Sequence, residues 1–204
     1  MKFIPQAPQM KTDEKPRLKA ANENPWYCLA TPYGEQKGEQ IDPGLLERNR
    51  VGWDHWRGGH VGLISEAFAA RMGTPTSSLP DPTQRADFAS THFEAPFIFL
   101  GYESIQDMDF SSAKFSNYVD FTAAVFRNVS FRSSTFSKNS TFVRARFFEN
   151  ADFSSGTFSK DVDFSSATFS KSTEFASATF SKANFSSASG HAANRGSRAF
   201  GSHG

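Results

Sequence analysis

The stretch Ala151-Asp-Phe-Ser-Ser-Gly-Thr-Phe-Ser-Lys160 shows the pattern that decides the fold, a phenylalanine that returns after five residues among small residues. The pattern runs from Phe88 to Phe185 with intervals of five or six residues. If every fourth of these repeating positions is placed in the same column, four columns result. Within a column, successive positions are 21 or 22 residues apart. The columns are Phe88, Phe110, Phe131, Phe153, Phe175 (column 1); Phe93, Phe115, Phe136, Phe158, Phe180 (column 2); Phe99, Phe121, Phe142, Phe164, Phe185 (column 3); and Ile105, Phe126, Phe147, Phe169 (column 4). Such spacing predicts a solenoid with four sides per coil, in which like residues stack.

The residue two positions before each of these Phe residues is small in most repeats, as at Ala113, Ala145 and Ala167. The large exceptions, Phe97, Glu103 and Met108, all lie near the start. In an extended segment, residues i and i−2 share a face, so each side is expected to send one large and one small side chain inward. A helix would need apolar spacings of three and four. A hairpin sheet would need regular turn residues, but residues 106–188 contain no Pro and only one Gly.

Three segments, Ala86-Asp-Phe88, Ala151-Asp-Phe153 and Ala183-Asn-Phe185, read Ala-Asp/Asn-Phe. They resemble the pentapeptide-repeat family, in its Phe-rich, eleven-residue double-unit bacterial variety. The resemblance implies a right-handed quadrilateral β-helix, here of about four to five coils, with bulged corners where a unit has an extra residue. The preceding segment also looks like one found before such repeats in bacterial proteins, through Asn24-Pro-Trp-Tyr27, Leu29-Ala-Thr31 and Asn49-Arg50 with Trp53.

The first 85 residues divide into three parts by composition. Residues 1–23 are polar, and we expect a disordered leader. Residues 24–73 are expected to be helical: Asp42-Pro43 starts one helix, which Gly58-Gly59 ends, and a second runs from about His60 to Met72. Their apolar residues are Leu45, Leu46, Trp53 and Trp56 in the first and Val61, Leu63, Ile64, Phe68 and Met72 in the second. Residues 74–85 form a Pro-rich linker. Since helices this short are unstable alone, we expect them to cap the first coil of the β-helix at residues 86–188.

Residues 189–204 break the repeat and have low complexity, so we expect a disordered tail. An open β edge invites pairing. Two explanations therefore stand side by side: the uncapped C-terminal coil pairs with a second copy in a homodimer, or the chain is a truncated or frame-shifted relative of a longer protein.

Charge and composition exclude several classes of function. The net charge is +1, and the basic and acidic residues number 11 and 10 in residues 1–85 and 9 and 11 in residues 86–188. This balance gives no bulk electrostatic attraction to nucleic acid or to an anionic membrane. Cys28 is the only cysteine, which favours a reducing compartment. The start, Met1-Lys-Phe-Ile-Pro-Gln6, has no apolar stretch long enough for a signal peptide. The longest apolar run, Phe97-Ile-Phe-Leu100, is too short to span a bilayer, so we expect a soluble, cytoplasmic protein.

No pattern in the sequence predicts catalytic, cofactor-binding or metal-binding residues. The pairs Asp107/Asp109 and Asp161/Asp163 are interpreted as solvated surface. No His-His or His-Cys spacing fits a metal site, and His55, His60 and Cys28 are expected to pack or to be exposed in the helical segment. The serines lack a histidine placed to activate them. We therefore expect no enzymatic activity and no cofactor.

Outward positions form ladders that repeat every 22 residues. They are Lys138, Lys160, Lys182; Thr135, Thr157, Thr179; and Asp152, Glu174. Repeat copying produces such ladders without any function.

These observations favour a non-enzymatic structural or protein-interaction module with an unknown protein partner. One alternative, suggested by the quinolone-resistance members of the family, is a DNA mimic that inhibits or protects a DNA-handling enzyme such as gyrase. Mimicry needs a strongly acidic face, which the balanced charges do not indicate. A second alternative is ice binding through the Thr ladder, for which a single Thr column beside Lys is a poor match.

Overall fold

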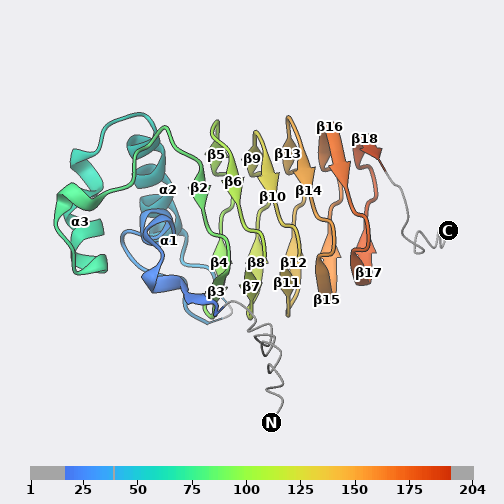
Figure 1. The fold of residues 1–204 in the computed structure, drawn as a ribbon, viewed down its shortest axis with the longest axis horizontal. Helices are drawn as coiled ribbons and strands as arrows, with labels where there is room; N and C mark the ends of the chain where they lie inside the picture. The colour runs from blue at the N-terminus through green and yellow to red at the C-terminus, as the bar shows by residue number, and fades with distance from the viewer. Residues whose placement is uncertain (1–16, 39, 194–204) are drawn as a thin grey trace, which may run out of the picture.

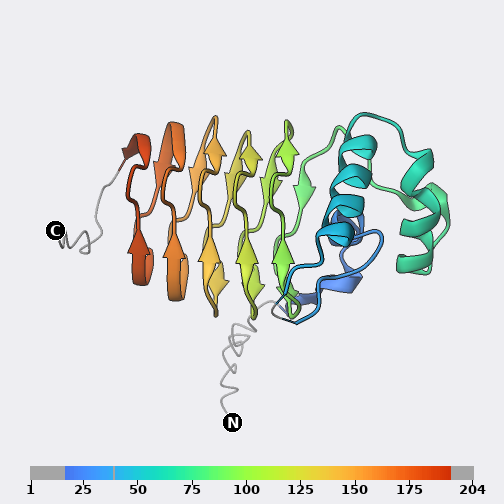
Figure 2. The same ribbon diagram turned by 180° about the vertical axis from the view of Figure 1, so that it is seen from behind.

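The structure is a computed structural model that describes residues 17–38 and 40–193. Short parallel strands form a solenoid of about five turns, and three helices cover the end that contains the first turn (Figures 1 and 2). The predicted fold class is confirmed.

Each turn of the solenoid has four short strands, one on each of four faces. Face 1 contains β2 (Ala86–Asp87), β6 (Met108–Asp109), β10 (Val129–Ser130) and β14 (Ala151–Asp152). Face 2 contains β3 (Thr91–Phe93), β7 (Lys114–Phe115) and β11 (Thr135–Phe136); face 3 contains β4 (Phe97–Ile98), β8 (Val119–Asp120) and β12 (Ser140–Thr141); face 4 contains β5 (Glu103–Ser104), β9 (Val125–Phe126) and β13 (Arg146–Phe147). In the last turns longer strands span two faces: β15 (Thr157–Asp163) and β17 (Thr179–Asn184) join faces 2 and 3, and β16 (Thr168–Glu174) and β18 (Ser189–Ala193) join faces 4 and 1.

The Phe columns fill the interior as the spacing predicts. Phe136 lies in register with Phe158, and their rings stack with centroids 4.5 Å apart and planes 4° from parallel. Rings of different columns meet edge to face, as Phe142 and Phe153 do at 5.6 Å and 89°. Each stacked pair adds about 0.5–1.5 kcal/mol to the value of burying the rings. The core is thus a continuous aromatic lattice.

Tight turns follow columns 1 and 3, and at several of them the Asp that precedes the Phe caps the turn. After Phe164, for example, Ser166 adopts a left-handed conformation (φ 56°), and the N–H of Ala167 donates to the Phe164 carbonyl at 3.0 Å. This is the geometry of a type II turn. The Oδ1 atom of Asp163 accepts from the N–H of Ser165 at 2.8 Å. The left-handed residues other than Gly are Ser90, Ser112, Ala123, Ser133, Arg144, Ser155, Ser166, Ser177 and Ser187.

These turns correct the interpretation of the aspartate pairs as solvated surface. Asp109 is buried, caps the N–H of Ser111 at 2.8 Å and forms an ion pair with Arg85 at 2.9 Å. Asp163 caps its own turn, as described above. Asp109 and Asp163 therefore hold turns together, Asp107 accepts from the Asn128 side chain at 2.8 Å, and of the four only Asp161 is exposed.

The first position of column 4 differs from the prediction. Ser104, not Ile105, lies in register with Phe126, and Ile105 is 72% exposed. The reason is that the interval from column 3 to column 4 is five residues in every described turn. In the first turn Gly101 is the left-handed residue that follows Phe99 (φ 69°), so the inward position of column 4 falls at residue 104. Tyr102 consequently points inward, stacked on Phe99 at 4.0 Å, and Glu103 is exposed rather than inward.

The helical segment contains three α-helices, and its beginning is ordered. Residues 17–23 are not the disordered leader we expected, because β1 (Lys19–Ala20) adds a parallel strand to β3 and the 3-10 helix η1 (Ala21–Glu23) follows it. The helices are α1 (Pro25–Ala30), α2 (Pro43–Arg57) and α3 (Gly62–Met72), with η2 (Thr76–Ser78) in the linker. The Asp42 side chain caps α2 as predicted, whereas α3 begins at Gly62 and leaves Val61 exposed.

The helical segment covers the first turn with aromatic side chains. The Tyr27 ring of α1 lies 5.4 Å from that of Phe93, and Trp53 of α2 lies 5.6 Å from Phe99. The Tyr102 hydroxyl donates to the Ala30 carbonyl at 3.1 Å. Figure 1 shows α3 on the far side of α1 and α2 from the solenoid. The predicted capping role is confirmed by these contacts.

The repeat continues beyond the boundary predicted at residue 188. Residues 189–193 form β18, which pairs with β16, so they are not disordered. Gly190 lies in register with Phe169 and adopts φ 118°, a conformation that favours glycine. The rest of the predicted tail, residues 194–204, and residues 1–16 of the predicted leader lie outside the described residues.

Candidate functional site

An extended surface hollow follows face 3. Two adjoining depressions, of about 710 and 720 Å³, share Tyr118 and Asn139. Together they form one groove, called here the face 3 groove, which runs from the helical segment to the last turn. Its wall and floor residues come from six segments: the loop before α2, β4, the corner before β8, β12, β15 and β17.

The loop between α1 and α2 forms one end of the face 3 groove through Gln36, Gly38, Gln40 and Ile41. Gln36 fixes this loop, because its amide donates to the Asp42 carbonyl at 3.0 Å and accepts from the Asp42 N–H at 2.8 Å. Since Asp42 also caps α2, the loop is tied to a rigid helix. Ile41 is exposed and, with Pro96 and the mostly buried Ile98, adds apolar surface to this end.

Tyr118 lies at the centre of the face 3 groove. Its N–H donates to the Asn117 side chain at 2.8 Å, and its hydroxyl donates to Oδ2 of Asp120 at 3.3 Å. Burial, together with the negative charge of Asp120, raises the pKa of Tyr118, so the phenol is neutral and remains a hydrogen-bond donor at neutral pH. The ring offers a half-buried aromatic surface of fixed orientation.

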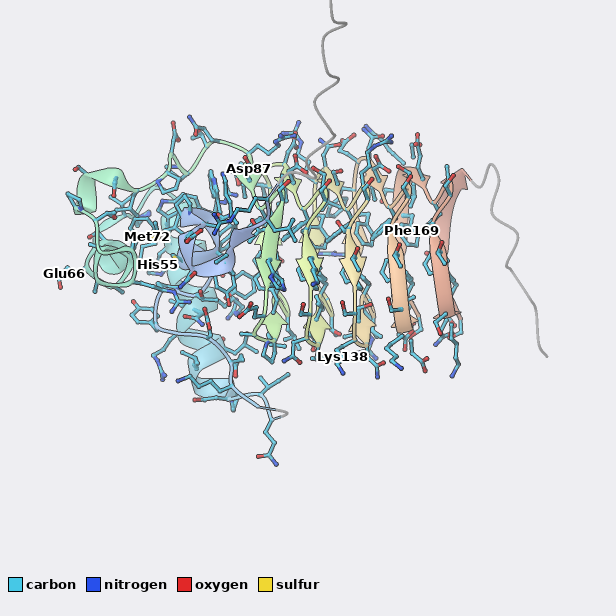
Figure 3. All side chains as sticks on the ribbon, turned by 60° about the horizontal axis from the view of Figure 1, so that its bottom comes forward. His55, Glu66, Met72, Asp87, Lys138 and Phe169 are labelled. Atoms are coloured by element: carbon cyan, nitrogen blue, oxygen red, sulfur yellow. The ribbon has the colours of Figure 1, made fainter. Side chains whose placement is uncertain are left out.

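Two cations lie at the rim of the face 3 groove. Lys138 and Lys160 are exposed, and the described residues give neither an ion-pair partner. Figure 3 shows Lys138 projecting away from the strands into solvent. Lys182 does not extend this ladder as predicted. It lies in register with Asp161 and pairs with it at 3.3 Å, because the interval from Phe180 to Phe185 is one residue shorter than those before it.

The floor of the face 3 groove is the outward column of face 3, and it is mostly polar. Asn184 donates to Asp163 at 3.0 Å, and the hydroxyls of Thr122 and Thr141 lie 3.2 Å apart. This arrangement can bind a ligand through hydrogen bonds, two positive charges and one aromatic ring. The described residues include no group of three or more His, Cys, Asp or Glu able to hold a metal ion.

The other residues singled out in the sequence lie apart from the face 3 groove. His55 and His60 are exposed on the helical segment, and Cys28 is buried, where desolvation raises the pKa of its thiol. The Thr ladder stacks in register on face 2 and the Asp152–Glu174 ladder on face 1, as predicted. Two parts of the face 3 groove, Tyr118 and the loop before α2, were not predicted from the sequence. The only signal for Tyr118 was a large aromatic residue at an outward position, and the proximity of the loop to face 3 is a tertiary contact.

Residues 110–157 match the family described as pentapeptide repeats (nine copies). This stretch of the chain is a pentapeptide-repeat segment. The match lies within the turns whose Phe columns and Asp-closed turns are described above, and members of this family are generally non-enzymatic. No curated protein matches the chain. In the part of the chain that the structure describes, no helix combines the length and the hydropathy needed to cross a membrane.

Proposed function

We propose that this pentapeptide-repeat protein is a non-enzymatic scaffold that binds an extended segment of a protein partner in the face 3 groove. The observation that carries the proposal is the continuity of the groove past a fixed Tyr118, with the unpaired Lys138 and Lys160 on its rim.

The dimensions of the solenoid suit an extended chain. Successive turns repeat at the spacing of neighbouring strands, about 4.8 Å, and an extended peptide rises about 3.3 Å per residue. A peptide along the groove therefore meets a new polar side chain of face 3 every one or two residues. Its carbonyl groups are natural acceptors for the lysine ammonium groups, and its side chains can pack on the Tyr118 ring.

Affinity capture with the full chain tests the proposal. The variants are Tyr118→Ala and Lys138→Glu/Lys160→Glu, and the control is Lys114→Glu, which lies on face 2. A protein captured by the parent and the control, and lost with both groove variants, is then purified and titrated against the same four chains by calorimetry. The proposal fails if no purified partner depends on the groove residues.

DNA mimicry is less well supported than protein binding in the groove. The outward column of face 1 is acidic at Asp87, Asp109, Asp152 and Glu174. However, Asp109 and Asp152 face Arg85 and Arg132 at 2.9 and 3.8 Å, so half of this column is neutralised. Inhibition or protection of gyrase in a supercoiling assay would revive the alternative.

Self-association through the last turn and a location in the cytoplasm stay predictions. Light scattering on the purified full chain tests the homodimer, and fractionation of the source cells tests the location.

A further inference from the structure

Among the described residues, Phe148 is the one phenylalanine whose side chain is largely exposed. Its side chain is 46% exposed, whereas that of its neighbour Phe147 is 1% exposed and lies in column 4. The turn does not require an aromatic residue there, because by register the equivalent positions in the adjacent turns are Arg127 and Ser170. A single exposed apolar side chain is ordinary on a protein surface, so the meaning of Phe148 depends on the side chains around it.

Three exposed arginines lie on the same turn as Phe148 or on the preceding one. Arg146 and Phe148 are two residues apart at β13 and are both exposed, so they share the outer side of face 4. Arg144, the left-handed residue of the turn before β13, is exposed as well. Arg127 lies beside Phe148 on the preceding turn, and the Arg146 guanidinium is 5.4 Å from the centre of the Phe148 ring. We call Arg127, Arg144, Arg146 and Phe148 the Arg–Phe patch.

The arginines of the Arg–Phe patch have no acidic partner among the described residues. Nearby cations do: Arg132 approaches Asp152 at 3.8 Å, and Lys171 pairs with Glu149. The repeat thus neutralises some of its surface cations but leaves these three guanidinium groups without an acidic partner, one of them beside an exposed ring. Guanidinium groups bind carboxylates in a bidentate manner, and an exposed ring offers an apolar anchor.

From this arrangement we propose that the Arg–Phe patch binds an acidic segment of another protein, one that also carries an aromatic or aliphatic side chain. The site is separate from the face 3 groove: its Phe148 end lies at the corner between faces 4 and 1, diagonally opposite the corner of Lys138 and Lys160. One scaffold can therefore hold two partners at the same time.

A short acidic peptide fits the surroundings better than a nucleic acid strand. Glu149 follows Phe148 directly, and the acidic column of face 1 lies across the same corner, with Asp152 and Glu174 in register. A continuous polyanion would have to pass these carboxylates. A peptide can place its acidic residues on the arginines and end before the corner.

Peptide selection on the full chain tests the proposal. A phage library of random 12-residue peptides is selected on the immobilised protein and counter-selected on the triple variant Arg144→Glu/Arg146→Glu/Phe148→Ser. Surviving peptides are synthesised with a fluorophore and titrated by anisotropy against the parent, Arg144→Glu/Arg146→Glu, Phe148→Ser and Lys138→Glu/Lys160→Glu. The last variant makes the same change in net charge at the opposite corner. Circular dichroism confirms the fold of each variant.

The expected survivors are rich in Asp and Glu and contain an aromatic or aliphatic residue. Their affinity should fall at least about tenfold for Arg144→Glu/Arg146→Glu and for Phe148→Ser, should stay unchanged for Lys138→Glu/Lys160→Glu, and should weaken with salt. Survivors without acidic residues, or no survivors at all, overturn the proposal. The proposal is also overturned if a twelve-nucleotide oligo(dT) binds the parent more tightly than the selected peptides do and loses this binding with the same variants. The occupant of the Arg–Phe patch would then be a nucleic acid.

Discussion

The Tyr102 hydroxyl donates a hydrogen bond to the Ala30 carbonyl across 3.1 Å, and this bond joins the first turn of the solenoid to α1. Both residues are fully or almost fully buried. The same Tyr ring stacks on Phe99 at 4.0 Å from the position two residues before column 4, where the next turn has Ala124. The first turn is therefore built to receive the helical segment, and that junction can be tested separately from the repeat.

Removal of the hydroxyl in Tyr102→Phe should lower the free energy of unfolding by about 1–2 kcal/mol, because a buried carbonyl loses its partner. Urea titration followed by tryptophan fluorescence measures the change. Tyr118→Phe is the matched control: its hydroxyl bonds a carboxylate at the rim of an open groove, so the loss there should be smaller. Equal losses in the two variants would contradict the role of the junction.

Because the Phe rings stack from turn to turn, we predict that the loss of stability on a Phe→Ala substitution depends on the turn in which the Phe lies. Phe153 is fully buried, with ring neighbours at 5.1 and 5.0 Å in the turns before and after it. Phe153→Ala should cost about 3–5 kcal/mol. Phe180→Ala, in the last turn and only partly buried, should cost clearly less. Thermal unfolding by circular dichroism ranks the two variants, and a parent-like melting temperature for Phe153→Ala would reject the stacked core.

The left-handed residues predict a stabilising substitution. Ser166 has φ 56°, a conformation that costs a residue with a Cβ about 1–2 kcal/mol. Since glycine loses about 0.5–1 kcal/mol in chain entropy, Ser166→Gly should raise the stability by about 0.5–1 kcal/mol. Ser170→Gly, at an exposed strand position of β16, should lower it by about the same amount. Chemical denaturation that shows the same sign for both variants would refute the turn assignment.

The Asp of the repeat motif is predicted to act through its acceptor oxygen rather than its charge. Oδ1 of Asp163 accepts from the Ser165 N–H at 2.8 Å and from the Asn184 side chain at 3.0 Å. Asp163→Ala should therefore cost about 0.5–1.5 kcal/mol, and Asp163→Asn, which keeps an acceptor oxygen, should recover most of it. Urea midpoints at neutral pH distinguish the two. If Asn behaves like Ala, the charge is what matters.

Arg57 is predicted to hold the linker onto the helices. Its guanidinium lies 4.7–5.3 Å from the ring centres of all three Trp residues, Trp26, Trp53 and Trp56, and donates to the carbonyls of Pro82 and Gln84. Burial lowers the pKa of Arg57 to about 10, so the group stays charged at neutral pH.

Arg57→Met should destabilise the helical segment by about 2–3 kcal/mol, and Lys should not replace Arg, because a compact ammonium cannot face three rings and two carbonyls. Near-UV circular dichroism of the Trp residues reports this loss, and Arg48→Met, exposed on α2, serves as the control. A Trp signal that melts at the parent temperature in Arg57→Met would contradict the prediction.

The sequence predicted the four Phe columns because residue spacing is a local property. In a strand, the spacing directly determines which side chains point to the same face. The prediction failed at column 4 of the first turn, where Ile105 was expected inside. The turn after column 3 has a fixed length set by its left-handed residue, Gly101, and this constraint became visible only in the backbone. The same limit explains why residues 17–23 and 189–193 were expected to be disordered: short polar segments become strands only when a solenoid edge offers them partners.

The amino-acid sequence by itself determined the period, the inward Phe residues, the start of one helix at Asp42 and the end of the next at Met72, and the order of the parts. All of these follow from spacing and local conformational preference. Only the tertiary structure decided which outward side chains meet. The face 3 groove needs a loop from the helical segment to approach face 3, and the Arg–Phe patch needs Arg127 and Phe148 to stack across two turns. Contacts between residues distant in sequence depend on where each turn closes, and a difference of one residue there moves a side chain from the core to the surface.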